Sequence, residues 1–227
     1  MRAHYSIHWC SFLAVALLLA QPLLAFQSPL SEESLREAYF LGQRRDGSLE
    51  RLAESYSRHF SPPETGPYVS AVILATPFLV AAQLSSNQTP NYSAQQAAAD
   101  HRKAGKETVQ ITVEIQLTAS YGQFLKVEKV GRPSGRSDAP AGLTGRSGDF
   151  WKDFEVQLFS GERVLQPSTV DGHPNYSCNE HGGCTLVGAT LRYDFPADAF
   201  SSDSASVTVH PPEGPSVTGQ FDLSHLR

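Results

Sequence analysis

One short stretch of the sequence groups side chains that could bind a metal ion. The segment HPNYSCNEHGGC places His173, Cys178, His181 and Cys184 within twelve residues. Imidazole and thiolate are the usual zinc ligands, and four of them complete a tetrahedron. The spacing H-x4-C-x2-H-x2-C is not that of a standard zinc finger, but its two-residue gaps are compatible with a compact knuckle. One interpretation of these four residues is therefore a metal site or the centre of a metalloenzyme.

The same cysteines have a second interpretation, a disulfide between Cys178 and Cys184. The third cysteine of the chain, Cys10, lies in a segment that we expect to be removed. An isolated pair of cysteines in an oxidising compartment usually forms a disulfide. The intervening Asn-Glu-His-Gly-Gly can turn tightly, because glycine adopts positive φ without strain. We favour the disulfide over a metal site or free thiols, and we expect no cofactor.

Other signatures of catalysis are missing from the sequence. There is no HExxH, P-loop or dinucleotide-binding glycine pattern. The nearest approach to a serine-hydrolase elbow, residues 145–149 (GRSGD), lacks the final glycine of G-x-S-x-G. Trp151 lies between Phe150 and Phe154, an aromatic group that we expect to be core. Four separate histidines are expected to be surface or hydrogen-bonded residues: His59, His101, His210 and His225.

The N-terminus has the pattern of a secretory signal peptide. Arg2 supplies a positive charge, the residues from Cys10 to Leu19 are an apolar core, and Pro22 precedes the small residue Ala25. The apolar core is too short for a membrane-spanning helix, which needs about 20 residues. We predict a signal peptide over residues 1–25, cleaved before Phe26, and a periplasmic or extracellular location. We expect no transmembrane segment after cleavage.

Residues 26–106 are predicted to be mainly helical, with one buried strand. Apolar side chains recur at helical spacing in residues 32–42 and again in residues 48–60, which predicts a helical hairpin. The apolar run 69–84 is interrupted by Pro77, so we expect a buried strand over 69–75 and then a short helix. Ser93 is expected to cap a third helix that ends at Gly105.

Residues 107–227 are predicted to form a β-sandwich. Every odd residue from Val109 to Leu117 is apolar and every even one is polar, as in a strand with one buried face. Similar alternation occurs in residues 154–158 and 187–195, while residues 129–149 are expected to be a mobile loop. The expected fold class is α+β, in which an N-terminal helical hairpin and short helices accompany an antiparallel, immunoglobulin-like β-sandwich body.

Five segments of the sequence resemble a set of uncharacterised exported proteins of soil bacteria. They are SEESLREAYFLGQRRDGS, GPYVSAV, PNYSAQQAAADHR, DFWKDFEV and GQFDLSHLR. The resemblance covers nearly all of the chain after the expected signal peptide. It implies a bacterial exported protein, and it carries no activity, ligand or catalytic residue to this chain.

These observations favour an exported, non-catalytic interaction or envelope-associated protein whose partner is an unknown protein or cell-envelope component. The net charge of −5 argues against nucleic acid, which needs clustered Lys and Arg. The main alternative is a metal-binding protein or an enzyme centred on His173, Cys178, His181 and Cys184. A ligand carrier is a further alternative, and it would need a sizeable apolar pocket.

Overall fold

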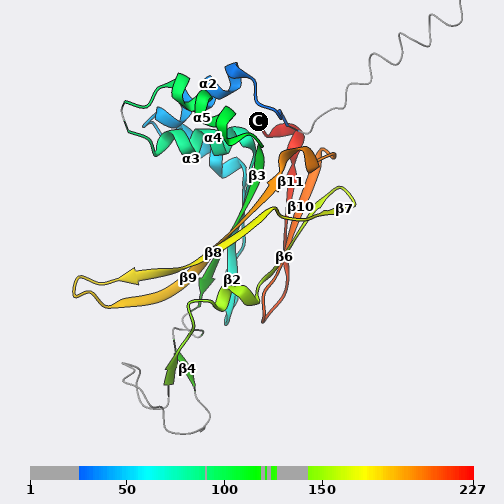
Figure 1. Ribbon diagram of the computed structural model, residues 1–227. Coiled ribbons are helices and arrows are strands. Elements are labelled where there is room, and N and C mark those ends of the chain that lie inside the picture. Colours follow the sequence, from blue (N-terminus) through cyan, green and yellow to red (C-terminus); the bar gives the residue numbers. More distant parts are fainter. Residues whose placement is uncertain (1–25, 90, 119–120, 122–123, 127–142) are drawn as a thin grey trace, which may run out of the picture.

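The structure is a computed structural model that describes residues 26–89, 91–118, 121, 124–126 and 143–227 (Figure 1). The expected signal peptide, residues 1–25, and residues 129–142 of the expected mobile loop lie outside the described residues. α-Helices precede most of the strands along the chain, and all strand pairings are antiparallel. The expected α+β class is therefore confirmed.

The described helices gather at one end of the molecule (Figure 1). They are α2 (Glu32–Gln43), α3 (Ser48–Ser55), α4 (Pro77–Ser86) and α5 (Ala94–Ala104). The Ser31 side chain accepts a hydrogen bond from the Ser34 amide at 3.1 Å and caps α2. Ser93 and Gln96 form a complete capping box on α5, and Gly105 ends that helix, as predicted.

Helix α3 is shorter than the sequence pattern predicts. It ends at Ser55, and Phe60 lies beyond it, because residues Ser57–His59 form strand β1 and pair with β2. Ser48 is the first residue of the helix. The cap position is Gly47, and the Asp46 carboxylate accepts a hydrogen bond from the Ser48 amide at 2.9 Å. Strand pairing has overridden a helical apolar spacing here.

Five strands form the first sheet. Their spatial order is β1 (Ser57–His59), β2 (Pro67–Ala75), β3 (Thr108–Leu117), β9 (Cys184–Pro196) and β8 (Thr169–Cys178). The predicted strand of residues 69–75 is confirmed as β2, and α4 follows it from Pro77. Val109, Ile111, Val113 and Ile115 are buried in β3, whereas Glu114 and Gln116 are exposed. The alternation predicted for β3 is therefore confirmed.

Four strands form the second sheet, in the order β11 (Val217–Asp222), β10 (Ser204–His210), β6 (Glu155–Ser160) and β7 (Arg163–Leu165). A separate short pair joins β4 (Phe124–Lys126) to β5 (Leu143–Gly145). Part of the segment expected to be a mobile loop is thus a paired strand, β5. Short 3-10 helices cover Phe150–Asp153, Ala197–Ala199 and Leu223–His225.

Both sheets contribute to one hydrophobic core. The buried side chains from the first sheet include Val72, Ile111 and Leu191, and those from the second include Leu158, Val207 and Phe221. A second, smaller core lies among the helices and includes Leu35, Ala38, Phe78, Leu79 and Ala82. Helices α2 and α4 approach closely at Gly42, where an added Cβ would lie 2.1 Å from the Ala82 carbonyl oxygen. The close packing of these helices therefore requires glycine.

The last residues of the chain join the helical end to the sheets. Leu223 is fully buried in the larger core, and Leu226 packs against both cores. The Tyr56 hydroxyl accepts a hydrogen bond from the Arg227 amide at 2.8 Å, and the Thr76 hydroxyl donates to the Arg227 carbonyl. The Arg227 guanidinium lies 4.5 Å from the centre of the Phe78 ring.

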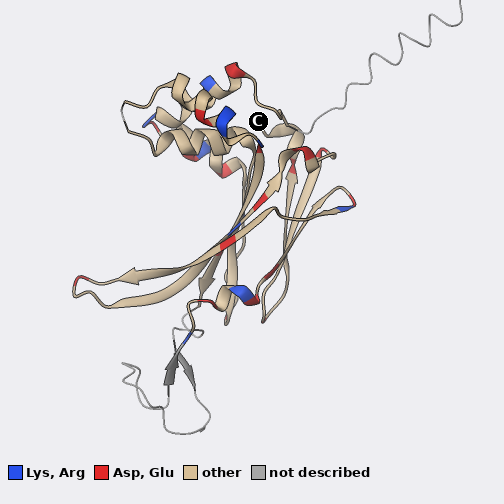
Figure 2. Cartoon of the chain, in the orientation of Figure 1, with Lys and Arg blue, Asp and Glu red and all other residues tan. Residues whose placement is uncertain are grey.

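Acidic and basic residues are interspersed along the described elements (Figure 2). None of the helices in the described ranges combines the length and the apolar character needed to cross a membrane.

Candidate functional site

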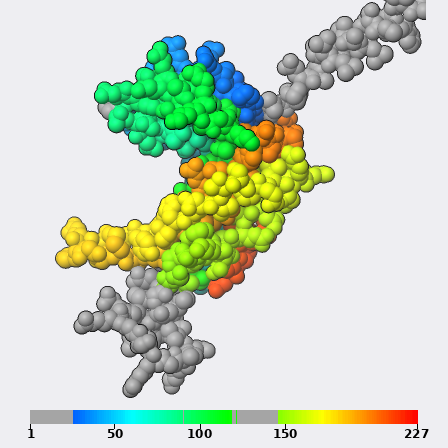
Figure 3. Space-filling model, in the orientation of Figure 1, coloured from blue at the N-terminus to red at the C-terminus, as the bar shows by residue number. Residues whose placement is uncertain are grey.

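The four residues of the predicted cluster lie on a single β-hairpin formed by β8 and β9. His173 is in the middle of β8, Cys178 ends that strand, His181 is in the turn, and Cys184 begins β9. The hairpin extends away from the rest of the molecule as a long arm (Figures 1 and 3). We refer to residues 176–187 as the hairpin tip.

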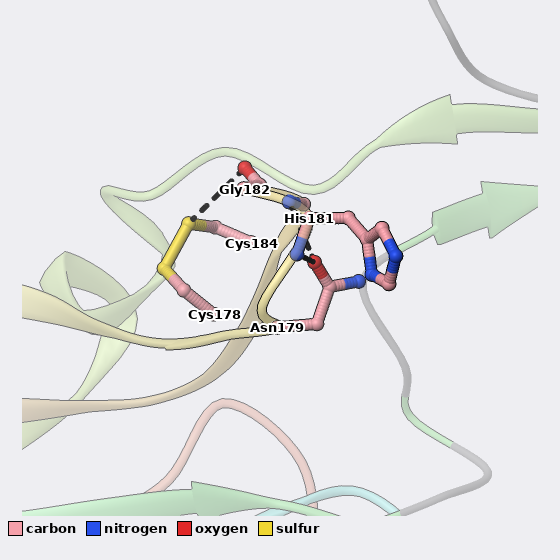
Figure 4. Close-up of a disulfide and its surroundings, with 6 residues drawn as sticks. Cys178, Asn179, His181, Gly182 and Cys184 are labelled. Atoms are coloured by element: carbon pink, nitrogen blue, oxygen red, sulfur yellow. Dashed lines mark hydrogen bonds between the residues drawn. A yellow bond between two sulfur atoms is a disulfide. The ribbon is translucent and has the colours of Figure 1, made fainter.

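Cys178 and Cys184 form a disulfide that closes the hairpin tip (Figure 4). The two residues face each other directly in the register of β8 and β9, and their Cα atoms are 4.0 Å apart. Residues directly opposite in an antiparallel pair bring their Cβ atoms close enough for such a bond. The strand pairing therefore places both sulfur atoms where they can bond.

Asn179 organises the turn between the two cysteines. Its side-chain oxygen accepts hydrogen bonds from the His181 amide at 3.0 Å and the Gly183 amide at 2.9 Å (Figure 4). Its backbone amide donates to the Gly183 carbonyl at 2.9 Å, and Gly182 has a φ of 81°. Glycine adopts such a φ at little cost. The sequence Asn-Glu-His-Gly-Gly thus forms a defined turn with its own hydrogen bonds.

The structure does not bring the four predicted ligands together. The two sulfur atoms are bonded to each other, and the His181 ring points away from them (Figure 4). His173 pairs with Thr190, five residues along β8 from Cys178, which corresponds to about 16 Å of strand. Within the described ranges, no group of three or more His, Cys, Asp or Glu side chains is arranged to hold a metal ion.

The hairpin carries exposed apolar side chains. Val170, Tyr176 and Val187 are 52%, 54% and 40% exposed, respectively. Tyr176 and Val187 belong to the hairpin tip, close to the disulfide in the strand register. Large apolar side chains at the end of a projecting arm are available for contact with another molecule.

The exposure of Val187 corrects the alternation predicted for residues 187–195. Asn175 pairs with Gly188, and Tyr176 pairs with Leu186, so Val187 is an extra residue on β9. This β-bulge changes the phase of the strand, because one inserted residue exchanges the two faces. Leu186 is consequently buried and Val187 is exposed, whereas Ala189, Leu191, Tyr193 and Phe195 are buried as predicted.

Trp151 fixes the base of the hairpin. An added Cβ on Gly172 would lie 2.8 Å from ring carbons of Trp151 and 2.9 Å from Leu191. Trp151 is partly buried against the larger core, and its neighbours Phe150 and Phe154 are buried. The aromatic group is therefore core, as expected. The Trp151 Nε1 atom is buried and has no hydrogen-bond partner among the described residues.

The remaining histidines that the sequence singles out have polar partners. His59 lies 3.1 Å from Glu54, His101 lies 2.8 Å from Glu107, His210 lies 2.6 Å from Ser216, and His225 lies 2.8 Å from Asp222. In the segment that approaches a hydrolase elbow, Ser147 accepts a hydrogen bond from the Asp149 amide at 3.2 Å and belongs to a turn. That turn leads into the 3-10 helix Phe150–Asp153.

Neither the models of known protein families nor the sequences of curated proteins give a match to this chain. The functional argument therefore depends on the geometry of the hairpin itself. That geometry combines a covalently closed end, a hydrogen-bonded turn and exposed apolar side chains.

Proposed function

We propose that this chain is an exported, non-catalytic interaction protein that contacts a protein or cell-envelope partner through the hairpin tip. The observation that carries the proposal is the exposure of Tyr176 and Val187 beside the Cys178–Cys184 disulfide at the end of an arm. Tyrosine is favoured in contact surfaces because it combines a large apolar area with a polar hydroxyl and few rotatable bonds. The disulfide lowers the number of conformations that the tip would lose on binding.

Export is part of the proposal. The signal-peptide pattern of residues 1–25 and the resemblance to exported proteins of soil bacteria support it. The disulfide supports it as well, because such bonds persist mainly in oxidising compartments outside the cytoplasm. We place the protein in the periplasm or outside the cell, with Phe26 as its first residue after cleavage.

We also propose that the two antiparallel sheets form an immunoglobulin-like sandwich. Support comes from the single core to which β2, β3 and β9 contribute from one sheet and β6, β10 and β11 from the other. In sandwiches of this kind, loops and hairpins at the ends of the sheets commonly contact partners. The proposed fold and the proposed role of the hairpin are therefore compatible.

Two kinds of function are less well supported. A net charge of −5 with interspersed charges does not provide the basic surface that nucleic acid needs (Figure 2). A metal centre at the predicted cluster would require reduced thiols, whereas Cys178 and Cys184 are bonded to each other.

Site-specific photo-crosslinking in exporting cells tests the proposed contact. A photoreactive residue replaces Tyr176 in one variant and Glu162 in a second. Glu162 is the matched control because it is an exposed residue in another turn, between β6 and β7. We expect one specific adduct from position 176 and none from position 162. N-terminal sequencing of the same exported protein is expected to begin at Phe26.

The partner in the adduct is then purified and its affinity is measured. We expect the double variant Tyr176→Ser/Val187→Ser to bind it at least about tenfold more weakly than the unaltered protein, which corresponds to about 1.4 kcal/mol. Equal affinity of the two proteins, or equal crosslinking from positions 176 and 162, would show that the hairpin tip is not the contact surface.

A further inference from the structure

A cavity of about 280 Å³ lies between α4 and α5, on the helical side of the molecule and away from the hairpin tip. Its walls are largely apolar. Leu35 comes from α2, Val80 and Leu84 come from α4, and Ala97 and Ala104 come from α5. Concave, largely apolar surfaces with a few polar groups are typical of binding sites for small molecules.

The cavity exists because α5 packs loosely. None of the residues of α5 is fully buried, and two of its four cavity-lining residues, Ala97 and Ala104, are alanine. Alanine side chains are too short to fill the space between two helices, although they favour the helix itself. Leu84 is 61% exposed at the cavity, so an apolar ligand would cover surface that now faces water.

The two carboxylates that line the cavity already have donors. Asp100 accepts a hydrogen bond from the Tyr92 hydroxyl at 2.9 Å. Burial, followed by this hydrogen bond, raises the pKa of Tyr92 to about 12, so the phenol stays protonated. Glu107 is engaged by the His101 ring at 2.8 Å and by the Leu30 amide at 2.7 Å. Both carboxylates are therefore hydrogen-bonded without a ligand.

A positive charge also lines the cavity, at the exposed residue Lys106, which directly precedes Glu107 in the chain. The ammonium group of Lys106 makes no hydrogen bond or ion pair with any residue in the described ranges, whereas the other lining cation, Arg192, is 3.3 Å from Asp194. A ligand can therefore satisfy Lys106 by bringing an anionic acceptor, and a carboxylate is the simplest group of that kind.

We propose that this cavity binds a small amphiphile with an apolar chain and a terminal carboxylate, of the class of medium-chain fatty acids. The chain would lie between Val80, Leu84 and Ala97, and the carboxylate would meet Lys106. An apolar cavity of roughly 150 Å³ accommodates benzene, so a cavity nearly twice as large suits a chain of roughly eight to ten carbons. This site is independent of the proposed contact through the hairpin tip.

Titration of the purified protein with octanoate, followed by NMR of the backbone amides, tests the proposal. We expect saturable binding with shifts concentrated in α4, α5 and the start of β3. Octylamine has the same chain with the opposite charge, and it is expected to bind at least about tenfold more weakly, because its ammonium group faces Lys106. Absence of saturation at roughly millimolar octanoate, or equal binding of the two compounds, would overturn the proposal.

Two variants and a matched control separate the effect of the Lys106 charge from that of the cavity volume. Lys106→Gln should weaken octanoate binding about threefold to fivefold, as expected for a partly exposed ion pair, and Lys103→Gln should leave it unchanged. Lys103 is the matched control because it is exposed near the same end of α5 and does not line the cavity. Ala97→Phe should fill the cavity and abolish binding, while a cooperative melt shows that the variant is folded. Equal binding by the two lysine variants would refute the role of Lys106.

Discussion

Gly172 and Trp151 determine how the arm is attached to the body. The ring of Trp151 occupies the space that a side chain at residue 172 would need, and Leu191 closes the other side. Leu191 is fully buried in the shared core. Strand β8 therefore packs directly against the core at Gly172, where the residue has no Cβ. A glycine inside a strand often marks such a close approach.

The disulfide provides the prediction at the scale of single residues. In the chain-entropy account, a loop as short as that between Cys178 and Cys184 contributes about 2 kcal/mol of stability. The double variant Cys178→Ser/Cys184→Ser should therefore melt cooperatively with a Tm lowered by roughly 4–8 °C at most, as measured by calorimetry. The core residues lie outside the hairpin tip, apart from Leu186, so the fold should remain.

Mass spectrometry of the unreduced protein is the companion measurement. The disulfide form is lighter than the dithiol form by the mass of two hydrogen atoms. Two free thiols together with one tightly bound zinc ion would contradict the disulfide and support the metal-centre alternative.

Elements with one buried face could be predicted from the sequence, and β3 is the clearest case. Its apolar residues alternate because one face meets the core and the other meets water. Strand β8 lacks this signal. Its residues are exposed or half-buried, and it contains Gly172 and Pro174, so its sequence is typical of a loop. The cysteine pair was recognisable by its spacing, but the arm that carries it was not.

The bulge in β9 could not be predicted from the sequence pattern either. Residues 187–195 alternate perfectly, and only the pairing with β8 shows that Val187 has been displaced from the buried face. Such a shift depends on the neighbouring strand rather than on the strand itself. The same reason applies to β1, where the apolar spacing predicts the end of a helix. The three residues Ser57–His59 acquire their strand structure from the pairing with β2.

Paired substitutions in β9 test the phase shift. Leu186→Ala should lower the free energy of unfolding by about 2–4 kcal/mol, because it removes a buried side chain. Val187→Ala should change it by no more than about 0.5 kcal/mol, because that side chain is largely exposed. Denaturant titration of both variants measures the difference. Comparable losses of stability, or a larger loss for Val187→Ala, would mean that the bulge is misplaced.

At the scale of the whole molecule, two hydrophobic cores are joined by the C-terminal residues. Leu226 contacts both cores, and Arg227 forms hydrogen bonds with Tyr56 and Thr76 at the helical end. The Tyr56 side chain is almost fully buried, so its hydroxyl depends on Arg227 for a hydrogen-bond partner. The helices and the sheets should therefore unfold together.

Removal of one hydroxyl tests this coupling. Tyr56→Phe removes the part-buried hydrogen bond between the Tyr56 hydroxyl and the Arg227 amide and should lower the free energy of unfolding by about 0.5–1.5 kcal/mol. Tyr68→Phe is the matched control, because the Tyr68 hydroxyl donates to Gln116 at an exposed position and its loss should cost little. Chemical denaturation followed by circular dichroism provides the measurement. A second transition in Tyr56→Phe would indicate that the helical end has separated from the sheets, and equal effects of the two changes would argue against the coupling.

The proline in β8 has a consequence for the behaviour of the protein at high concentration. Strand β8 ends its sheet, and over ten residues it could offer unpaired backbone groups to a second strand. Such an edge is a template for aggregation. Pro174 lacks an N–H, and Asp171 places a charge nearby, so the row of donors is interrupted near its middle. The arm can thus extend into solvent with its side chains accessible while resisting edge-to-edge association with other copies of the chain.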